Sequence, residues 1–333
     1  MNRKELTSFF NEITPTDEQM RNMYAKIKTY KEGEVPMKKT TKKVSVFAVV
    51  TAAFLIFATA AFASTLNWNE LLIQHFKPSE DQINKMNDSV STPGATVTKN
   101  GVTITVKQTI ADSQNFYVLY EMTVPESIEL NDDIVWDWTS LNLNQARTNG
   151  FGSRSGAILK QDKHSRTVLF HEQRKVHNGT GTATMQFYDL TLNQKIFDKK
   201  GEFIDLKEIP LIEGEWQITW DYKIDDTQSI KLEPNKSVSL KGSKNKITKI
   251  EVSPLSIFVL IEGTDIVTRV EPIVKFKDGS QLSFNYKSPG KAFMYSNSND
   301  DQGNHLYYEL GKIINPEDVE SISIGNVTIP VTK

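Results

Sequence analysis

The feature that most constrains this chain is an apolar run of twenty residues, 44–63, that contains no charged side chain. A helix rises about 1.5 Å per residue, so a run of this length covers the roughly 30 Å hydrocarbon core of a bilayer. Four lysines (38, 39, 42 and 43) lie just before the run, whereas the twenty residues after it hold a single lysine, Lys77. Because cytoplasmic flanks are rich in Lys and Arg, we expect a single-pass membrane protein with a cytoplasmic N-terminus and an extracellular region at 64–333.

Two other interpretations of the apolar run are open. A helix buried in a soluble core usually shows a polar stripe on one face, and this run shows none. A cleavable signal peptide is the stronger alternative, because Ala61, Phe62 and Ala63 match the small-x-small pattern of a cleavage site. The 43 preceding residues and the length of the run both exceed those of an ordinary signal peptide, so we favour a retained anchor.

Charge and cysteine content exclude several classes of function and site. Residues 1–43 hold ten Lys and Arg against six Asp and Glu, a net charge of +4, which leaves −6 for the rest of a chain with −2 overall. An acidic outside region argues against a nucleic-acid partner. The chain has no cysteine, which excludes disulfides, thiolate metal sites and a cysteine nucleophile.

Residues 1–43 show the spacing of two short amphipathic helices. In each, four apolar residues fall at i, i+3, i+4 and i+7 and line one face, and Thr16 and Gln19 form a capping-box pattern at the start of the second. Helices this short are marginal in water, which favours a protein partner, although a position along the membrane surface is an alternative. The candidate contact residues are Leu6, Phe9, Phe10, Ile13, Met20, Met23, Tyr24 and Ile27.

A resemblance to known proteins rests on the lysine-flanked anchor and on three stretches: TPTDEQMRNMYAKIK at 14–28, GVTITVKQTIADSQNFYVLYEMTVP at 101–125 and ITKIEVSPLSIFVLIEG at 247–263. With these features the chain resembles single-pass anti-sigma-factor-like regulators of Gram-positive bacteria. The resemblance implies that the cytoplasmic N-terminus binds an extracytoplasmic-function sigma factor and that a β-rich region follows the membrane helix. The zinc-containing class of anti-sigma domains uses a His and paired cysteines, and residues 1–43 contain neither.

Residues 64–94 are expected to form a juxtamembrane helical region and a linker. Trp68 lies where an aromatic belt at the membrane interface would be, and Ser79 is placed to cap a second helix. Residues 89–94 turn to small polar residues and proline, which is typical of a joint between a helix and a strand. Apolar residues at helix-like spacing indicate the first helix: Leu66, Trp68, Leu71, Leu72 and Phe76.

Alternating apolar residues dominate from residue 95 onwards. Short strands without intervening helices point to antiparallel sandwiches, so we expect a mainly β fold outside the membrane, with two Ig-like β-sandwich domains at 95–233 and 234–333. The predicted strands form a hairpin over 102–124 with a turn at 111–115, and further strands at 167–170, 182–190, 216–224, 247–252, 255–261, 267–276 and 281–286.

A faint internal repeat supports two domains. The stretch FYVLYE at 116–121 resembles IFVLIE at 257–262, and each follows an Ile/Val-rich strand and a turn. Because buried strands often look alike, chance similarity is the alternative. Proline and polar residues at 233–236 interrupt the strands and place the domain boundary there.

No motif in the outside region predicts catalysis. His164, His171 and His177 lie close in sequence but lack metal-ligand spacing, and no G-x-S-x-G elbow is present. We therefore expect no enzyme activity, no cofactor and no metal. Trp136 and Trp138 would share one face of a strand, where such a pair either packs in a core or stacks on cell-wall sugars.

Two functions from different classes follow. The first is a signal-transduction protein that regulates transcription by binding a sigma factor inside the cell and sensing the state of the envelope outside, with a possible cell-envelope ligand. The second is a cell-surface or cell-wall-binding module with an inert cytoplasmic tail. The two matched apolar faces in the tail favour the first, because an inert tail has no need of them.

Overall fold

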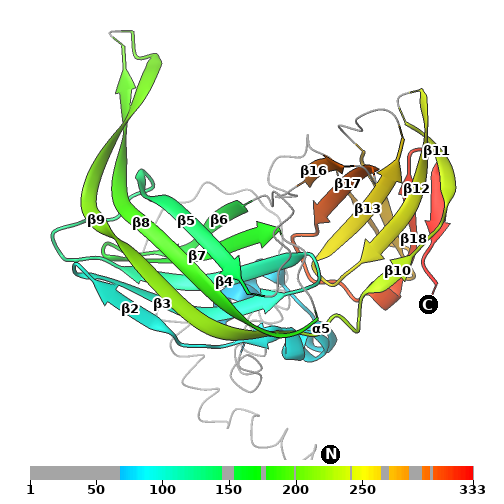
Figure 1. Ribbon diagram of the computed structural model, residues 1–333, viewed down its shortest axis with the longest axis horizontal. Helices are drawn as coiled ribbons and strands as arrows, with labels where there is room; N and C mark the ends of the chain where they lie inside the picture. The colour runs from blue at the N-terminus through cyan, green and yellow to red at the C-terminus, as the bar shows by residue number, and fades with distance from the viewer. Residues whose placement is uncertain are drawn as a thin grey trace, which may run out of the picture. The chain divides into compact units, whose positions relative to one another are not determined.

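The structure is a computed structural model that describes residues 68–144, 154–173, 178–198, 200–240, 242–263, 270–284, 295–300 and 303–332 (Figure 1). All of these residues belong to one compact unit, 55–333. The predicted transmembrane helix at 44–63 and the predicted cytoplasmic helices within 1–43 lie outside the described residues. No helix in the described part is long and apolar enough to cross a membrane.

Antiparallel β-structure dominates the described chain, which confirms the mainly β prediction (Figure 1). The first β domain consists of two sheets whose inner faces share one apolar core. The larger sheet has the order β1-β3-β4-β7-β6, with β2 pairing β3, and the smaller has the order β5-β8-β9. The strands are β1 (Val90–Ser91), β2 (Thr96–Lys99), β3 (Val102–Ala111), β4 (Asn115–Thr123), β5 (Ile134–Leu143), β6 (Arg154–Gln161), β7 (Ser165–Gln173), β8 (Gly179–Phe197) and β9 (Phe203–Ile224).

The second β domain also has two sheets around one apolar core. Its larger sheet has the order β10-β12-β13-β17-β16, with β11 pairing β12, and its smaller sheet has the order β15-β14-β18-β19. The strands are β10 (Ile230–Leu232), β11 (Lys236–Leu240), β12 (Ser243–Val252), β13 (Ser256–Glu262), β14 (Ile273–Phe276), β15 (Gln281–Ser283), β16 (Tyr295–Asp300), β17 (Gly303–Glu309), β18 (Val319–Ile324) and β19 (Val327–Pro330), with a short 3-10 helix, η2 (Pro316–Asp318), before β18.

The larger sheets of the two domains have the same topology. Reading β10 to β13 for β1 to β4, and β17 and β16 for β7 and β6, converts one strand order into the other. The register between β3 and β4 is irregular between Val106 and Gln108, and that between β12 and β13 is irregular between Ile247 and Lys249. These positions correspond when FYVLYE is aligned with IFVLIE, so the topology and the irregularity both support an internal repeat.

The alternation of apolar residues accounts for the core of the first domain. Val102, Ile104 and Val106 on β3 are fully buried, while the residues between them are only partly buried. Successive strand residues point to opposite faces, so this pattern turns one face inwards. The predicted turn at 111–115 is present between β3, which ends at Ala111, and β4, which starts at Asn115.

The chain crosses from the first to the second domain between β9, which ends at Ile224, and β10. Strand β10 precedes the boundary that the sequence placed after residue 233. It pairs with residues 250–252 of β12 and so forms part of the second domain. Only its pairing with β12 shows that this short strand belongs to the second domain, because three residues are too few to show a distinctive sequence pattern.

Two short helices precede the β domains: α4 (Glu70–Phe76) and α5 (Glu80–Met86), the latter followed by a 3-10 turn, η1 (Asn87–Ser89). The Ser79 side chain accepts a hydrogen bond from the Gln82 N–H, and the Gln82 side chain accepts one from the Ser79 N–H. This capping box satisfies two amides that have no partner within the helix, and it confirms Ser79 as the cap.

Trp68 does not lie where the sequence placed it. The side chain is 3% exposed and belongs to an apolar cluster formed by α4, α5 and the outer face of the larger sheet of the first domain. The prediction of an interfacial position for Trp68 is therefore wrong. The outer face carries the apolar residues Ile110, Tyr117 and Leu119, and the helices and Trp68 cover them.

Trp136 and Trp138 do not share a face, contrary to prediction. The Trp136 ring packs on the core, 5.1 Å from the Phe187 ring and 5.2 Å from the Trp216 ring, whereas Trp138 is 55% exposed. The adjacent strand β8 has an irregularity at Asp189, which adopts a φ of 35°. A bulge of this kind changes which residues point inwards, so the simple alternation ends there.

Candidate functional site

Buried polar side chains gather where the two β domains meet. The turn between β3 and β4 faces the corresponding turn between β12 and β13, so equivalent parts of the repeat contact each other. Such groups are rare inside proteins because each loses its hydration, and they need partners. We call this set the junction cluster: Asp112, Ser113, Asn115, Tyr117, His171, Glu251, Ser253, Ser256 and Glu309.

The Asp112 carboxylate holds the two domains together. Its Oδ1 accepts hydrogen bonds from the backbone N–H groups of Gln114 and Asn115, at 2.9 and 2.8 Å, and so stabilises its own turn. Its Oδ2 accepts from the Leu255 N–H at 3.1 Å and from the Ser256 hydroxyl at 2.9 Å, both in the second domain. Burial raises the pKa of Asp112 to about 6, because the loss of hydration outweighs the hydrogen bonds that favour the charged form.

A second contact between the turns involves Glu251. The Ser113 hydroxyl donates to Glu251 Oε1 at 2.6 Å and lies 3.1 Å from the Ser253 hydroxyl. Burial alone would raise the pKa of Glu251, but the hydrogen bond from Ser113 and the nearby charge of Lys249 together lower the pKa below its ordinary value. Glu251 therefore carries a negative charge at neutral pH, with Lys249 Nζ 3.4 Å from its Oε2.

Glu309 of the second domain reaches across to β4 and β7 of the first. The Tyr117 hydroxyl donates to Glu309 Oε1 at 2.7 Å, and His171 Nδ1 lies 3.5 Å from Glu309 Oε2. The His171 ring stacks on the Tyr117 ring at 4.3 Å, and its Nε2 lies 2.8 Å from Asn115 Oδ1. One carboxyl group thus contacts both an aromatic hydroxyl and an imidazole of the other domain.

The protonation of this group follows from its burial. Loss of hydration lowers the pKa of His171 to about 3, so the ring is neutral at pH 7. The tautomer that fits its contacts donates from Nε2 to Asn115 and leaves a lone pair on Nδ1 facing Glu309. Burial raises the pKa of Glu309 to about 7, despite the opposing effect of the Tyr117 hydrogen bond. A protonated Glu309 supplies the hydrogen-bond donor that His171 Nδ1 otherwise lacks among the described residues.

The cavity beside the junction cluster is very small. It measures about 10 Å³ and is lined in part by His171, Gln173 and Glu309. That volume suits about one water molecule. The cavity therefore has no room for an organic ligand, whereas Asp112 and Glu309 can exchange a proton near neutral pH.

Helices α4 and α5 contact both β domains next to the junction cluster. Leu255 and Ile313 of the second domain join the apolar cluster that contains Phe76 and Met86 of the helices. The Asn315 side-chain amide donates to Asp81 Oδ2 at 2.8 Å. The segment that follows the predicted membrane anchor is thus packed against the place where the two domains meet.

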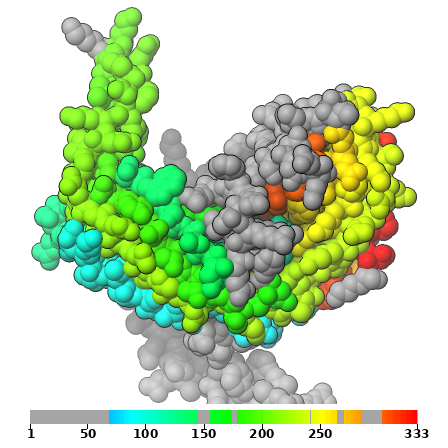
Figure 2. Space-filling view, viewed as in Figure 1, coloured from blue at the N-terminus to red at the C-terminus, as the bar shows by residue number. Residues whose placement is uncertain are grey.

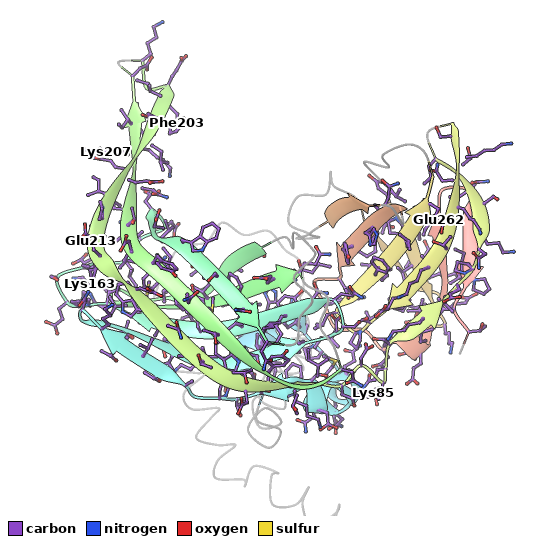
Figure 3. All side chains as sticks on the ribbon, viewed as in Figure 1. Lys85, Lys163, Phe203, Lys207, Glu213 and Glu262 are labelled. Atoms are coloured by element: carbon purple, nitrogen blue, oxygen red, sulfur yellow. The ribbon has the colours of Figure 1, made fainter. Side chains whose placement is uncertain are left out.

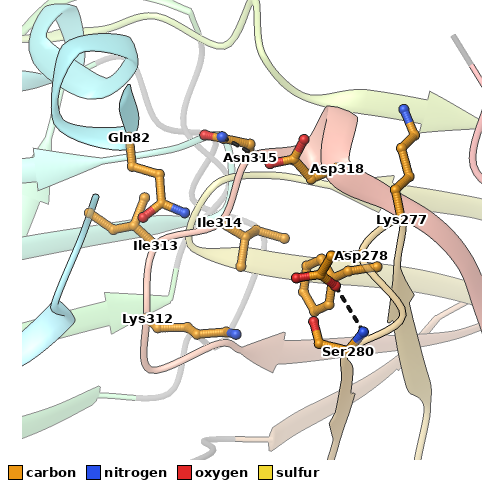
Figure 4. A pocket seen from close by; sticks show the side chains of 10 residues that line it. Gln82, Lys277, Asp278, Ser280, Lys312, Ile313, Ile314, Asn315 and Asp318 are labelled. Atoms are coloured by element: carbon orange, nitrogen blue, oxygen red, sulfur yellow. Dashed lines mark hydrogen bonds between the residues drawn. The ribbon is translucent and has the colours of Figure 1, made fainter. Parts of the chain in front are cut away.

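A larger pocket, of about 530 Å³, lies beside α5 and the second domain (Figure 4). Gln82, Lys277 and Lys312 are among its lining residues. The Asp278 carboxylate accepts a hydrogen bond from the Ser280 N–H at 2.8 Å, and the Lys312 ammonium lies 5.0 Å from the centre of a phenylalanine ring. The Asp278 contact lies within the turn between β14 and β15, so it belongs to the local fold and does not indicate a ligand.

His164 and His177 lie apart from the residues described above. His164 Nδ1 lies 2.8 Å from the Ile128 carbonyl oxygen, and His177 lies outside the described residues. Within the described ranges no group of His, Asp and Glu is placed to hold a metal ion.

The residues predicted to bind a sigma factor remain predictions. All of them lie outside the described part of the chain: Leu6, Phe9, Phe10, Ile13, Met20, Met23, Tyr24 and Ile27.

The sequence does not indicate the junction cluster. It predicts only a turn at 111–115, which contains Asp112, and no pattern marks Glu309. The signal that was present is the internal repeat, because it pairs the turn at 112–114 with the turn at 253–255. A repeat of two sheets does not reveal that these turns face each other, and only the folded chain shows the contact.

Comparisons with known proteins match part of the chain. Residues 36–123 match a family described as Domain of unknown function (DUF4179). The matched residues include the predicted anchor, both described helices and strands β1 to β4. No curated protein matches the chain. A similar solved structure is titled "The crystal structure of the conserved domain protein from Bacillus anthracis"; it is 16% identical, with a TM-score of 0.48, over 70% of this chain and 75% of that one.

Proposed function

We propose that this protein is a membrane-anchored anti-sigma factor. Residues 1–43 bind an extracytoplasmic-function sigma factor, the segment 44–63 crosses the membrane, and two Ig-like β domains outside the cell sense the state of the envelope. The observation that carries the proposal is that α4 and α5, which follow the predicted anchor, pack against both β domains at their junction. A change in how the domains meet therefore reaches the segment nearest the membrane.

The contacts support a mechanical connection of this kind. Phe76 on α4 lies 5.2 Å, ring to ring, from Tyr117, which donates to Glu309 of the second domain. Asp81 on α5 accepts from Asn315 of the second domain. If the domains part, the helices lose contacts with one of them, because a packed interface has few intermediate arrangements.

The sequence supports the cytoplasmic half of the proposal. Two amphipathic helices with matched apolar faces in a segment of 43 residues need a partner to bury those faces. In the resembling family that partner is a sigma factor. The proposal includes neither an enzymatic activity nor a nucleic-acid partner.

The test is capture of the partner from cells with the intact protein. Full-length chain solubilised in detergent should retain a sigma factor, and the same chain without residues 1–43 should not. Retention of the sigma factor by the truncated protein, or its absence from both preparations, would contradict the proposal.

A second candidate function, a module that binds a cell-wall glycan, is favoured by one surface of the first domain. Trp138 on β5 pairs with Tyr188 on β8, and Tyr188 pairs with Glu215 on β9. These three residues form one row on the outer face of the β5-β8-β9 sheet. The next row holds Ser140 and Gln186, whose side chains hydrogen-bond at 3.2 Å. An exposed aromatic ring beside hydroxyl and amide groups suits a sugar, since the ring covers its apolar face and the polar groups bond its hydroxyls.

This second function has its own test. The full-length protein should sediment with insoluble cell-wall polysaccharide, and Trp138→Ala should reduce the bound fraction about tenfold. Thr219→Ala, on the same outer face in a row beyond the aromatic pair, is the matched control and should leave binding unchanged. Equal sedimentation of Trp138→Ala and the unsubstituted protein would rule out this surface as the glycan site.

A further inference from the structure

The β8–β9 hairpin extends beyond the rest of its sheet. Strand β5 pairs with β8 only as far as Leu192, whereas β8 and β9 continue to pair up to Phe197 and Phe203. The extension projects from the first domain in the ribbon and space-filling views (Figure 1, Figure 2). We call residues 193–210 the arm; Figure 3 labels Phe203 and Lys207 on it.

The arm carries most of the exposed large apolar side chains of the described chain. The described residues include eight exposed large apolar side chains, and five of them lie in the arm: Ile196, Phe197, Phe203, Ile204 and Leu206, which are 38%, 55%, 58%, 61% and 37% exposed. The rings of Phe197 and Phe203 contact each other across the strands at 6.3 Å. A two-stranded ribbon with such a surface is marginal in water, so a further partner is expected to cover it.

The two edges of the arm differ. The outer edge of β8 is covered at its base, where the Asn193 N–H donates to the Asp133 carbonyl at 2.8 Å and Lys195 pairs with the Asp133 carboxylate at 2.7 Å. The outer edge of β9 has no neighbouring strand in the described part of the chain. An edge of this kind is a template for pairing with another strand.

The Leu206 amide shows where this edge is open. Its N–H donates to the side chain of the preceding residue, Asp205 Oδ1, at 2.8 Å. The Asn193 N–H points away from β9, to Asp133, and Asn193 pairs with Glu208, so the alternation of the antiparallel ladder turns the Leu206 N–H away from β8. A side chain thus takes the place that a neighbouring strand would fill.

We propose that the β9 edge of the arm pairs with the β9 edge of a second copy of this chain, antiparallel, about a two-fold axis through Leu206. In that register Leu206 lies opposite Leu206, and Asp205 of each copy lies opposite Lys207 of the other. The pairing is self-complementary, as a two-fold interface requires, and it makes two ion pairs.

Neighbouring registers lack this complementarity. An axis through Asp205 places two carboxylates opposite each other, and an axis through Lys207 places two ammonium groups opposite each other. An axis between Leu206 and Lys207 brings Asp205 opposite Glu208. Like charges in directly opposite positions are destabilising, so the sequence of the edge favours the axis through Leu206.

Pairing also resolves the features that make the free arm unusual. The Leu206 N–H gains a backbone carbonyl, and Asp205 turns to Lys207 of the second copy. Two ribbons become a four-stranded sheet, which is more stable than a two-stranded ribbon, and Phe203 approaches Ile209 of the other copy.

A lipid surface fits the arm less well. The turn beyond the Phe197–Phe203 pair holds charged residues, and the Asp198 carboxylate accepts from the N–H groups of Lys200 and Glu202 at 2.8 Å each. Insertion of the tip into a bilayer would carry these carboxylates in ahead of the aromatic rings, at a large cost in hydration.

Charge reversal tests the proposed register in the full-length protein in detergent, with the dimer dissociation constant measured by sedimentation equilibrium. Asp205→Lys and Lys207→Asp each replace two ion pairs by two like-charge contacts and should weaken the dimer at least tenfold. The double variant restores both pairs and should return the dissociation constant to within about threefold of the original. A dissociation constant that the single substitutions leave unchanged would overturn the register. A double variant whose dissociation constant is as high as those of the single variants would also overturn it.

A cysteine crosslink tests the axis itself, and the absence of native cysteine makes it unambiguous. Directly opposite residues have Cα atoms about 4.5 to 5.5 Å apart, within the range of a disulfide, so Leu206→Cys should give a covalent dimer on mild oxidation. Ile204→Cys, also exposed on the arm, lies four residues from its counterpart, about 14 Å at 3.4 Å per residue, and should give no covalent dimer. Equal crosslinking at both positions, or none at either with a monomeric parent protein, would refute the pairing.

Discussion

The Tyr117 hydroxyl and the Glu309 carboxyl group are joined by a 2.7 Å hydrogen bond that links residues 192 positions apart and connects the two β domains. The same carboxyl group lies 3.5 Å from His171. Glu309 is largely buried, so its proton affinity depends on the domains being closed. A contact between domains that also holds a proton makes their association sensitive to pH.

Replacement of Glu309 by Gln should remove a pH-dependent part of the stability. The pKa of Glu309 is raised from 4.5 to about 7, so between these values the folded chain binds more protons than the unfolded chain. The contribution is therefore fully present below about pH 4.5 and is lost as the pH rises through about 7. From pH 5 to pH 8, the unfolding free energy of the unsubstituted protein should fall relative to Glu309→Gln by on the order of 2 to 3 kcal/mol.

Urea unfolding at both pH values measures this difference. Glu262→Gln is the matched control, because Glu262 is an exposed carboxylate on β13 of the same domain. The control should show the same pH dependence as the unsubstituted protein. An unchanged pH slope in Glu309→Gln would contradict the assignment.

His171 should act with the opposite sign. Burial lowers its pKa from 6.5 to about 3, so in this interval the folded chain binds fewer protons than the unfolded chain. Its contribution falls as the pH drops from about 6.5 towards 3. His171→Gln should therefore reduce acid sensitivity, by up to about 4 kcal/mol between pH 6.5 and 3, as followed by tryptophan fluorescence during acid titration. An acid transition at the same pH in both proteins would argue against this role.

Loss of the Asp112 carboxylate should weaken the junction. Asp112→Ala leaves the amides of Gln114, Asn115 and Leu255 without their acceptor in a buried place. Each such group costs about 1 to 3 kcal/mol, and we expect a total loss of roughly 3 kcal/mol after local rearrangement. Thermal unfolding compares it with Asp137→Ala, an exposed aspartate on β5 that should change stability by less than about 0.5 kcal/mol. Similar effects of both substitutions would show that Asp112 does not hold the turns.

Aspartate substitutions on the predicted cytoplasmic faces should release the sigma factor. Replacing Phe9 and Phe10, or Met23 and Ile27, places unpaired charges in an apolar contact and should cost several kcal/mol of binding. Transcription from promoters of the released factor should rise while the membrane anchor and β domains remain intact. Lys28→Glu, outside the predicted contact set, should have little effect, since exposed pairs contribute at most about 1 kcal/mol. Unchanged transcription and unchanged capture in the apolar variants would remove the anti-sigma proposal.

The proposed topology is tested with reporter fusions. A reporter that is active only in the cytoplasm should be active when fused at Met1 and silent when fused after Lys333. The physical reason is the lysine asymmetry around 44–63, which directs the basic flank to the cytoplasm. Activity at the C-terminal fusion would contradict a single-pass orientation with the β domains outside.

Local features of the helices and β domains could be predicted from the sequence because they depend on neighbouring residues. Ser79 and Gln82 lie within one helical turn of each other, and a capping box needs nothing more. The alternation at Val102, Ile104 and Val106 turns one face of a strand inwards whatever it packs against. The matching stretches at 116–121 and 257–262 indicated a repeat, and the common sheet topology supports it.

Tertiary structure decided the features that depend on distant residues. The register between β8 and β9 is irregular at Asp189, and Trp136 and Trp138, which pair with β8 on either side of it, differ in burial. Trp68 is buried because it packs with the two helices on the apolar outer face of the larger sheet. Asp112 contacts Leu255 and Ser256 across more than 140 positions, and the pKa of Glu309 is raised because domain association excludes water from it. Periodicity specifies which face of a strand is apolar, whereas the partner of that face, and the hydration of a carboxyl group beside it, are set only when the chain has folded.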